Sequence, residues 1–216
     1  MTKQRLQRDI PGKRAVFLDK DGTIIKNIPY NANTALIELA PGVSTGLRLL
    51  HEAGYALVVV SNQSGVARGF FTEEDMTAVG RHLARLFEEA GACLTDYYYC
   101  PHLPEGTVAE YAIPCQCRKP EPGLFLQAAR EHGLDCTRSW LIGDILGDVE
   151  AGRRAGCRTI LVDSGNEDEW LLSPQRLPHH IVNNLTEAAQ VILALSEETA
   201  LLETKDERQN GNGSNR

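Results

Sequence analysis

Residues 15–23, Ala-Val-Phe-Leu-Asp-Lys-Asp-Gly-Thr, decide the fold of this chain. The unbroken apolar run over residues 15–18 is typical of a strand that is buried on both faces of a parallel sheet. Two aspartates, Asp19 and Asp21, follow the run directly, and Gly22 lets the backbone turn sharply after them. On these residues alone two interpretations stay open: a polar turn with aspartates at its corners, or two carboxylates that converge on one site.

Three further apolar runs have the same character, and patterns with helical spacing separate them. The runs are residues 56–60, 140–142 and 159–162. The helical spacing predicts helices at residues 41–54, 72–87, 148–156 and 184–195. Short apolar strands that alternate with helices predict an α/β fold, with a three-layer, doubly wound, Rossmann-like parallel sheet. In such a fold, ligands bind beyond the carboxyl ends of the strands.

Length and charge exclude several classes of protein. The chain has 216 residues, of which 42% are hydrophobic, so a domain with its own core is expected without disulfide bonds. Asp and Glu outnumber Lys and Arg by 29 to 22, and the net charge of −7 argues against a nucleic-acid partner. No stretch approaches the roughly 18 apolar residues that suggest a membrane-spanning helix, and residues 1–14 do not resemble a signal peptide. We therefore expect a cytoplasmic protein with reduced thiols and no membrane partner, and we expect a monomer.

Composition also divides the chain. Residues 1–13 are expected to form a flexible arm and residues 14–195 the folded domain. From residue 196 to 216 the apolar periodicity fades into Gln-Asn-Gly-Asn-Gly-Ser-Asn-Arg, which predicts a disordered tail. Little chain is left between the first two strands for a large cap domain, so we expect an open site that is shaped by loops.

Polar side chains follow the second and third apolar runs as well as the first. Ser61-Asn62-Gln63-Ser64-Gly65 comes after the second run, and Asp144 and Asp148 come after the third. Taken singly, these residues also fit a polar strand-to-helix loop and caps at a helix N-terminus. Taken together, they bring acids and hydroxyls to one edge of the sheet, where clustered carboxylates suit Mg²⁺. Arg118-Lys119 offers cations to a phosphate there.

The six cysteines cluster in part. Three thiols and one imidazole, which together form a closed tetrahedral set for structural zinc, come from Cys100, His102, Cys115 and Cys117. Zinc would staple the loop between residues 97 and 119 and so hold the Arg118-Lys119 pair in place. The alternatives are unrelated loop cysteines or a disulfide bond. The remaining cysteines, interpreted as core thiols, are Cys93, Cys136 and Cys157.

The motifs in this order resemble those of haloacid dehalogenase-like phosphatases. Residues 17–24 resemble the first signature of that family, and its second, third and fourth motifs are matched by Ser61, by Lys119 and by the pair Asp144 and Asp148. Three stretches narrow the resemblance, over residues 14–195, to the D,D-heptose 1,7-bisphosphate phosphatases and their histidinol-phosphatase relatives: residues 58–69, 99–102 and 115–120. The sequence departs from the family at Ile145, where a lysine is common.

The resemblance implies a role for each motif residue. Asp19 would be the nucleophile that forms an aspartyl-phosphate, and Asp21 would protonate the leaving oxygen and later deprotonate water. Ser61 and Lys119 would stabilise the phosphoryl oxygens. Mg²⁺ would be held by Asp19, the backbone carbonyl of Asp21 and Asp144, with a metal-bound water on Asp148. The substrate would be contacted by Asn27, Ile28, Pro29, Tyr30, Asn62, Gln63, Ser64 and Arg118.

The implied activity is Mg²⁺-dependent hydrolysis of a phosphomonoester. The substrate would be the 7-phosphate of D-glycero-D-manno-heptose 1,7-bisphosphate, a precursor of lipopolysaccharide. Histidinol phosphate is the alternative substrate within this class. The alternative from another class is a non-catalytic, zinc-stabilised binding protein, and the intact nucleophile Asp19 argues against it because a binding protein needs none. Ile145 removes one cationic contact, which bears on the substrate more than on the reaction.

Overall fold

Residues 15–18 form a central strand of a six-stranded parallel sheet. The computed structural model describes residues 12–211, and for residues 199–211 it describes the backbone only. The strands lie in the order β3-β2-β1-β4-β5-β6, and every neighbouring pair is parallel. They are β1 (Ala15–Leu18), β2 (Ala56–Asn62), β3 (Leu94–Cys100), β4 (Trp140–Gly143), β5 (Arg158–Val162) and β6 (His180–Val182).

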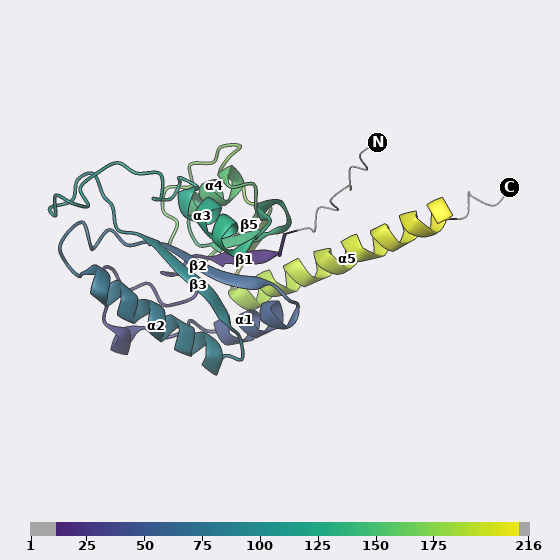
Figure 1. Ribbon diagram of the computed structural model, residues 1–216, viewed down its shortest axis with the longest axis horizontal. Coiled ribbons are helices and arrows are strands. Elements are labelled where there is room, and N and C mark those ends of the chain that lie inside the picture. The colour runs from purple at the N-terminus through teal and green to yellow at the C-terminus, as the bar shows by residue number, and fades with distance from the viewer. Residues whose placement is uncertain (1–11, 212–216) are drawn as a thin grey trace, which may run out of the picture.

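Helices cover both faces of this sheet (Figure 1). One face packs against α1 (Val43–Glu52), α2 (Glu73–Glu89) and α5 (Leu185–Gly211), and the other against α3 (Gly123–His132) and α4 (Leu146–Arg154). Alternate residues of β1 enter different cores: Val16 and Leu18 pack into one, while Phe17 packs against Phe125 of α3 in the other. The unbroken apolar run therefore reflects burial on two faces. The predicted three-layer, doubly wound α/β fold is confirmed.

Three elements go beyond the predicted set. β3 lies at one edge of the sheet, and its exposed or half-buried Thr95, Tyr97 and Tyr99 give it no continuous apolar run. Its presence corrects the expectation that the chain is irregular from Tyr97 onward, because β3 continues to Cys100. β6 has only three residues, and α3 begins at Gly123 with a short apolar face. Each of these elements carries too few apolar residues to stand out by periodicity.

The end of β2 and the start of α4 differ from the predicted bounds. β2 extends to Asn62 because it pairs with β3 there, so Ser61 and Asn62 lie inside the strand rather than after it. α4 begins at Leu146, so Asp148 lies in its first turn.

The ends of the fold also differ from the prediction. Lys13 pairs with Leu134, so ordered structure begins before residue 14. α5 continues to Gly211, where a disordered tail from residue 196 was expected, and it runs away from the body of the molecule (Figure 1). Good helix formers such as Glu, Ala and Leu continue after the apolar periodicity fades. Residues 1–11 and 212–216 of the expected arm and tail lie outside the described residues.

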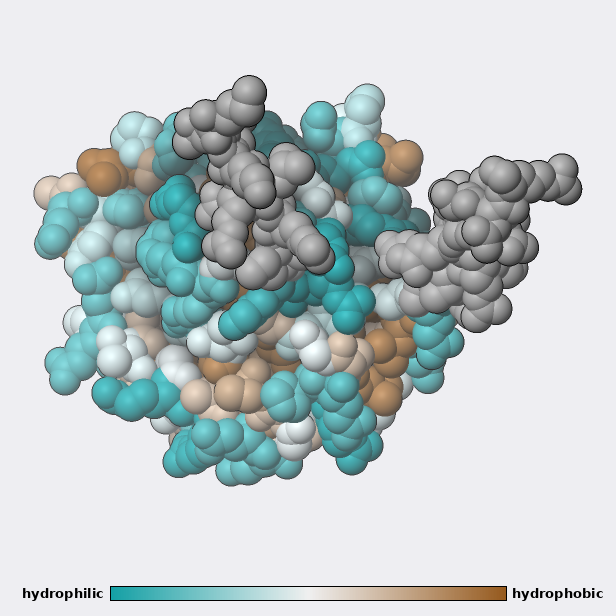
Figure 2. Space-filling view, turned by 45° about the vertical axis from the view of Figure 1, so that its right-hand side comes forward, coloured by the Kyte–Doolittle hydropathy of each residue, from teal (hydrophilic) through white to brown (hydrophobic). Residues whose placement is uncertain are grey.

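The segment between β1 and β2 contains a short 3-10 helix (Thr34–Leu36) and α1. The face of the molecule shown in Figure 2 is largely hydrophilic, with hydrophobic residues in small groups. Within residues 12–211 no helix combines the length and the apolar composition that would cross a membrane.

Candidate active site

The carboxyl ends of three adjacent strands bring the predicted acids together. Asp19 follows β1, Ser61 lies near the end of β2, Asp144 follows β4, and Lys119 reaches the same point from the loop before α3. A cavity of about 190 Å³ opens there. Its lining consists of Asp19, Asp21, Asn27, Ser61, Asn62, Lys119, Asp144, Ile145, Asp148 and Asn166. The interpretation of these residues as one convergent site, rather than as separate turns and caps, is the one that the geometry supports.

Lys119 lies buried among the carboxylates. Its ammonium pairs with Asp19 and, at 2.7 Å, with Asp148, and it donates to the carbonyl of Val60 at 3.1 Å. Burial alone would lower the pKa of Lys119, but the carboxylates of Asp148 and Asp19 raise it above its usual value. Lys119 therefore stays positively charged.

Burial disfavours the charged form of Asp19 as well, and in a carboxyl group this raises the pKa. Burial raises its pKa well above the ordinary value, Lys119 opposes that shift, and the neighbouring carboxylates of Asp148 and Asp144 add to it. A charged Asp19 thus needs more positive charge than Lys119 alone supplies.

Asp144 is held from two sides. Thr23 Oγ1 donates to its Oδ1 at 3.1 Å, and Asn166 Nδ2 donates to its Oδ2 at 2.7 Å. Burial, and then the charge of Asp148, raise the pKa of Asp144 to about 6. The turn passes close by at Gly22, which has a φ of 86° and would place a Cβ 2.1 Å from Asp144 Oδ2. Only glycine fits at this position.

The donor set suits a hard divalent cation. One carboxylate oxygen from each of Asp19, Asp144 and Asp148 lies within 4.8 Å of the other two, and all three residues are buried. Three carboxylates against one ammonium leave negative charge in a buried place, and oxygen ligands of this kind are those that Mg²⁺ takes. The residues present therefore fit the expected metal, although Asp148 Oδ1 also pairs with the ammonium of Lys119.

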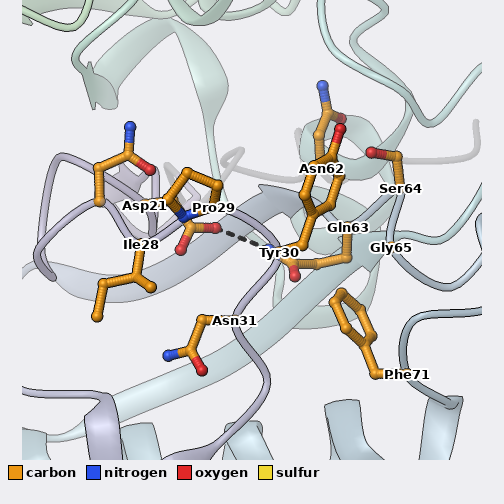
Figure 3. Close-up of a pocket in the computed structure, with 11 residues that line it drawn as sticks. Asp21, Ile28, Pro29, Tyr30, Asn31, Asn62, Gln63, Ser64, Gly65 and Phe71 are labelled. Atoms are coloured by element: carbon orange, nitrogen blue, oxygen red, sulfur yellow. Dashed lines mark hydrogen bonds between the residues drawn. The ribbon is translucent and has the colours of Figure 1, made fainter.

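Asp21 links this cavity to a second one, of about 300 Å³ (Figure 3). Its carboxylate accepts hydrogen bonds from Lys20 Nζ to Oδ1 at 2.8 Å and from Gln63 Nε2 to Oδ2 at 2.9 Å. Gln63 Nε2 also donates to Ser61 Oγ at 2.7 Å. The second cavity is lined by Asp21, Asn27, Ile28, Pro29, Tyr30, Asn31, Asn62, Gln63, Ser64, Gly65 and Phe71. It contains every predicted substrate contact except Arg118.

Some neighbours of the site were not predicted. Asn166 lies in the loop after β5 and belongs to none of the motifs. Thr23 belongs to the first signature, but nothing in the sequence indicates its hydrogen bond to Asp144. Their hydrogen bonds to Asp144 depend on chain segments that are far apart in sequence. Phe71 and Asn31 line the second cavity and were not predicted either.

Cys100, His102, Cys115 and Cys117 form a second cluster, beside the end of β3. Cys100 Sγ lies 3.1 Å from Cys117 Sγ and 3.6 Å from Cys115 Sγ, and His102 Nδ1 lies 3.2 Å from Cys117 Sγ. The hydrogen bond between Cys117 and Cys100 lowers the pKa of the Cys117 thiol to about 5. Four donor atoms at this spacing fit a tetrahedral zinc ion, and none of the six cysteines forms a disulfide.

The Cys/His loop also contacts the residues beside the carboxylate site. Arg118 Nη1 donates to the carbonyl of His102 at 3.5 Å. Asn62 makes two hydrogen bonds to the backbone of Lys119, at 3.0 and 3.1 Å. Arg118 lines neither of the two cavities described above.

The other three cysteines differ from one another. Cys157 is buried as predicted, and Cys136 is half-buried against the same core. Cys93 is exposed in the turn before β3, so its interpretation as a core thiol is wrong. A lone cysteine next to a strand gives no periodic signal that distinguishes the two environments.

Comparison with known proteins gives a consistent result. Residues 116–188 match the family described as HAD-hydrolase-like. The chain is 42% identical, over 68% of its length and 81% of the relative, to the D-glycero-beta-D-manno-heptose-1,7-bisphosphate 7-phosphatase of Rhodopseudomonas palustris. It is 35% identical, over 71% and 84%, to the corresponding alpha enzyme of Photorhabdus laumondii. The D,D-heptose 1,7-bisphosphate phosphatase of B. bronchiseptica, solved with magnesium and phosphate, is 27% identical with a TM-score of 0.71, over 84% of this chain and 98% of that one.

Proposed function

The chain belongs to the haloacid dehalogenase-like phosphatases, and from that premise we propose that it removes the 7-phosphate of a D-glycero-D-manno-heptose 1,7-bisphosphate. The observation that carries the proposal is the convergence of Asp19, Asp21 and Lys119 beside a polar cavity of about 300 Å³. A cavity of this size suits a sugar phosphate.

The proposed reaction has two steps. In the first, Asp19 attacks phosphorus and forms an aspartyl-phosphate while Asp21 gives a proton to the departing sugar oxygen. In the second, Asp21 takes a proton from water, whose oxygen attacks phosphorus and releases Asp19. Lys119 and the hydroxyl of Ser61 stabilise the negative charge on the phosphoryl oxygens in both steps.

Two metals would fit this chain, one for the chemistry and one for the structure. Mg²⁺ would be held by Asp19, the backbone carbonyl of Asp21 and Asp144, with Asp148 beside it, and it would offset the repulsion between a carboxylate and a phosphate. Zinc on Cys100, His102, Cys115 and Cys117 would be structural, because the four protein donors leave no position for a substrate. The cytoplasmic location and the monomeric state stay predictions.

Initial rates with Mg²⁺ test the proposed substrate. The comparison uses both anomers of the heptose 1,7-bisphosphate, histidinol phosphate and fructose 1,6-bisphosphate. We expect kcat/KM to be highest for one heptose anomer, since relatives with each preference are similar to this chain. A higher kcat/KM for histidinol phosphate would replace the heptose assignment, and no hydrolysis of any of them would refute the proposed reaction.

A further inference from the structure

Lys20 is a charged side chain with no access to solvent. Its exposed fraction is 0%, and it lines neither cavity of the site. The hydrogen bond of its ammonium goes to Asp21 Oδ1, at 2.8 Å. Asp21 itself is 29% exposed on its side chain and faces both cavities. Lys20 therefore touches the site only through this carboxylate.

Burial of this ammonium costs free energy, so its presence here calls for a reason other than packing. A buried charge loses its hydration, and a single carboxylate partner compensates only part of that loss. The backbone fixes Lys20 firmly, because its carbonyl accepts from the amides of both Ile24 and Ile25 at 3.1 Å. The lysine side chain thus extends from a closed turn directly behind Asp21. A neutral side chain would fill this position at lower cost if only packing mattered.

The two oxygens of Asp21 are consequently not equivalent. Lys20 holds Oδ1 from inside the protein, and Oδ2 is left toward Gln63 and the second cavity (Figure 3). Because Oδ1 is paired with the buried ammonium, Oδ2 is the oxygen of Asp21 that is left for the reacting groups. Oδ2 has one lone pair for Gln63 Nε2, and its O–H can point to a substrate oxygen.

We propose that Lys20 is a positioning residue that reserves Asp21 Oδ2 for proton transfer to and from the reacting oxygens. This inference rests on the proposed phosphatase reaction. As the aspartyl-phosphate bond forms and the sugar P–O bond breaks, the proton of Oδ2 moves to the sugar oxygen. As water attacks phosphorus and the bond to Asp19 breaks, a water proton returns to Oδ2.

The proposal predicts a dependence on the leaving group. A sugar oxygen leaves poorly as an alkoxide and needs the proton, whereas p-nitrophenolate leaves readily without one. kcat/KM reports the steps up to departure of the first product. Loss of Lys20 should therefore lower kcat/KM for a sugar phosphate and leave kcat/KM for p-nitrophenyl phosphate nearly unchanged. A residue that only supports the fold would lower both values alike.

The experiment uses the full chain with Lys20→Met, which removes the charge at similar length, and Lys20→Gln as a second neutral variant. For the heptose bisphosphate we expect kcat/KM to fall by about 100-fold, at the low end of the usual contribution of general acid catalysis. For p-nitrophenyl phosphate we expect a change of less than about 3-fold in kcat/KM, together with a burst of p-nitrophenol because the second step has slowed. In an Asp21→Asn background, Lys20→Met should cause no further loss.

Equal losses on the two substrates, or an additive loss in the Asp21→Asn background, would overturn the proposal. If neither neutral variant folds, as judged by thermal unfolding, Lys20 serves the fold and the proposal is also overturned. If the wild type rejects heptose bisphosphate but hydrolyses histidinol phosphate, that alkyl phosphate takes its place in the comparison. The heptose assignment then fails while the role of Lys20 is still tested.

Discussion

The carboxylate site and the Cys/His cluster lie at neighbouring strand ends but differ in their donor atoms and in their access to a cavity. At the carboxylate site, Asp19, Asp144 and Asp148 repel one another, and a cavity gives access to them. In the Cys/His cluster, one donor comes from the last residue of β3 and three come from the loop after it, and none of the four lines either of the two cavities described above. Open oxygen donors favour an exchangeable metal that takes part in chemistry, whereas closed sulfur donors favour a permanent one that holds the chain.

The two regions meet at Arg118 and Lys119. Arg118 is tied to the Cys/His loop through His102, and Lys119 is tied to β2 through Asn62 and pairs with Asp19. A change in the cluster should thus reach the reaction through the position of these cations. A change at the carboxylate site should leave the cluster intact. The following predictions test this asymmetry.

The largest effect is expected at the carboxylate site. Asp19→Asn removes the proposed nucleophile, and we expect kcat/KM to fall by more than about 10⁴-fold, as for nucleophiles in other enzymes. The fold and the zinc content should not change, because Lys119 keeps Asp148 as its partner. Steady-state kinetics and thermal unfolding measure both effects. Asp163→Asn, an exposed acid after β5 with the same change of charge, is the control. Near-normal turnover of Asp19→Asn would falsify the assignment of the nucleophile.

Sequence alone predicted that Asp19, Ser61 and Asp144 lie close together, because each stands at or just after the carboxyl end of a strand. The chain order of β1, β2 and β4, each apolar and buried, places Asp19, Ser61 and Asp144 at one edge without knowledge of any contact. Asn166 and the buried contact of Lys20 with Asp21 could not be predicted in this way. The first lies in a loop whose path is set by tertiary contacts, and an isolated Lys in a polar turn is typical of an exposed residue. The long α5 was missed for a related reason, since periodicity measures burial and not helix propensity.

The second prediction concerns the cluster. Cys117→Ser replaces a proposed thiolate ligand, and we expect zinc affinity to fall by more than about 100-fold, because even the hydrogen-bond partners of a ligand contribute 10–100-fold. Zinc content by mass spectrometry and the melting temperature should both fall, and added Mg²⁺ should not restore the lost activity. Cys93→Ser, an exposed thiol outside the cluster, is the control. Brief treatment of the wild type with a chelator should do the reverse, with loss of activity that Mg²⁺ restores while zinc stays bound. Full zinc content in Cys117→Ser would remove this residue from the ligand set.

The third prediction concerns Arg118 and Lys119, where the two regions meet. The planar guanidinium of Arg118 suits a second, non-reacting phosphate, whereas Lys119 is proposed to act on the transferred one. Arg118→Ala should lower kcat/KM for a heptose 1,7-bisphosphate by about 10–100-fold, since hydrogen bonds to charged groups contribute about 1.5–3 kcal/mol. The loss for the matching 7-monophosphate should be much smaller. Lys119→Ala should lower both values alike, and Arg130→Ala, an exposed residue of α3, should lower neither. Equal losses in Arg118→Ala would exclude the second-phosphate role and leave Arg118 as part of the loop.

The smallest effect is expected at Ile145. This side chain lies just before α4, is 39% exposed and lines the carboxylate cavity. It stands where the family resemblance leads us to expect a lysine. Without that cation, we expect the preference for a bisphosphate to depend more heavily on Arg118. Ile145→Lys should therefore raise kcat/KM for the bisphosphate by about 2–5-fold, the value of a partly exposed charge pair of under about 1 kcal/mol. The gain should shrink as salt is added, because ions screen an exposed pair. It should also offset part of the loss in Arg118→Ala when the two changes are combined. A gain on the monophosphate of the same size would mean that the new cation acts on the transferred phosphate, and the division of labour between Arg118 and Lys119 would then not extend to position 145.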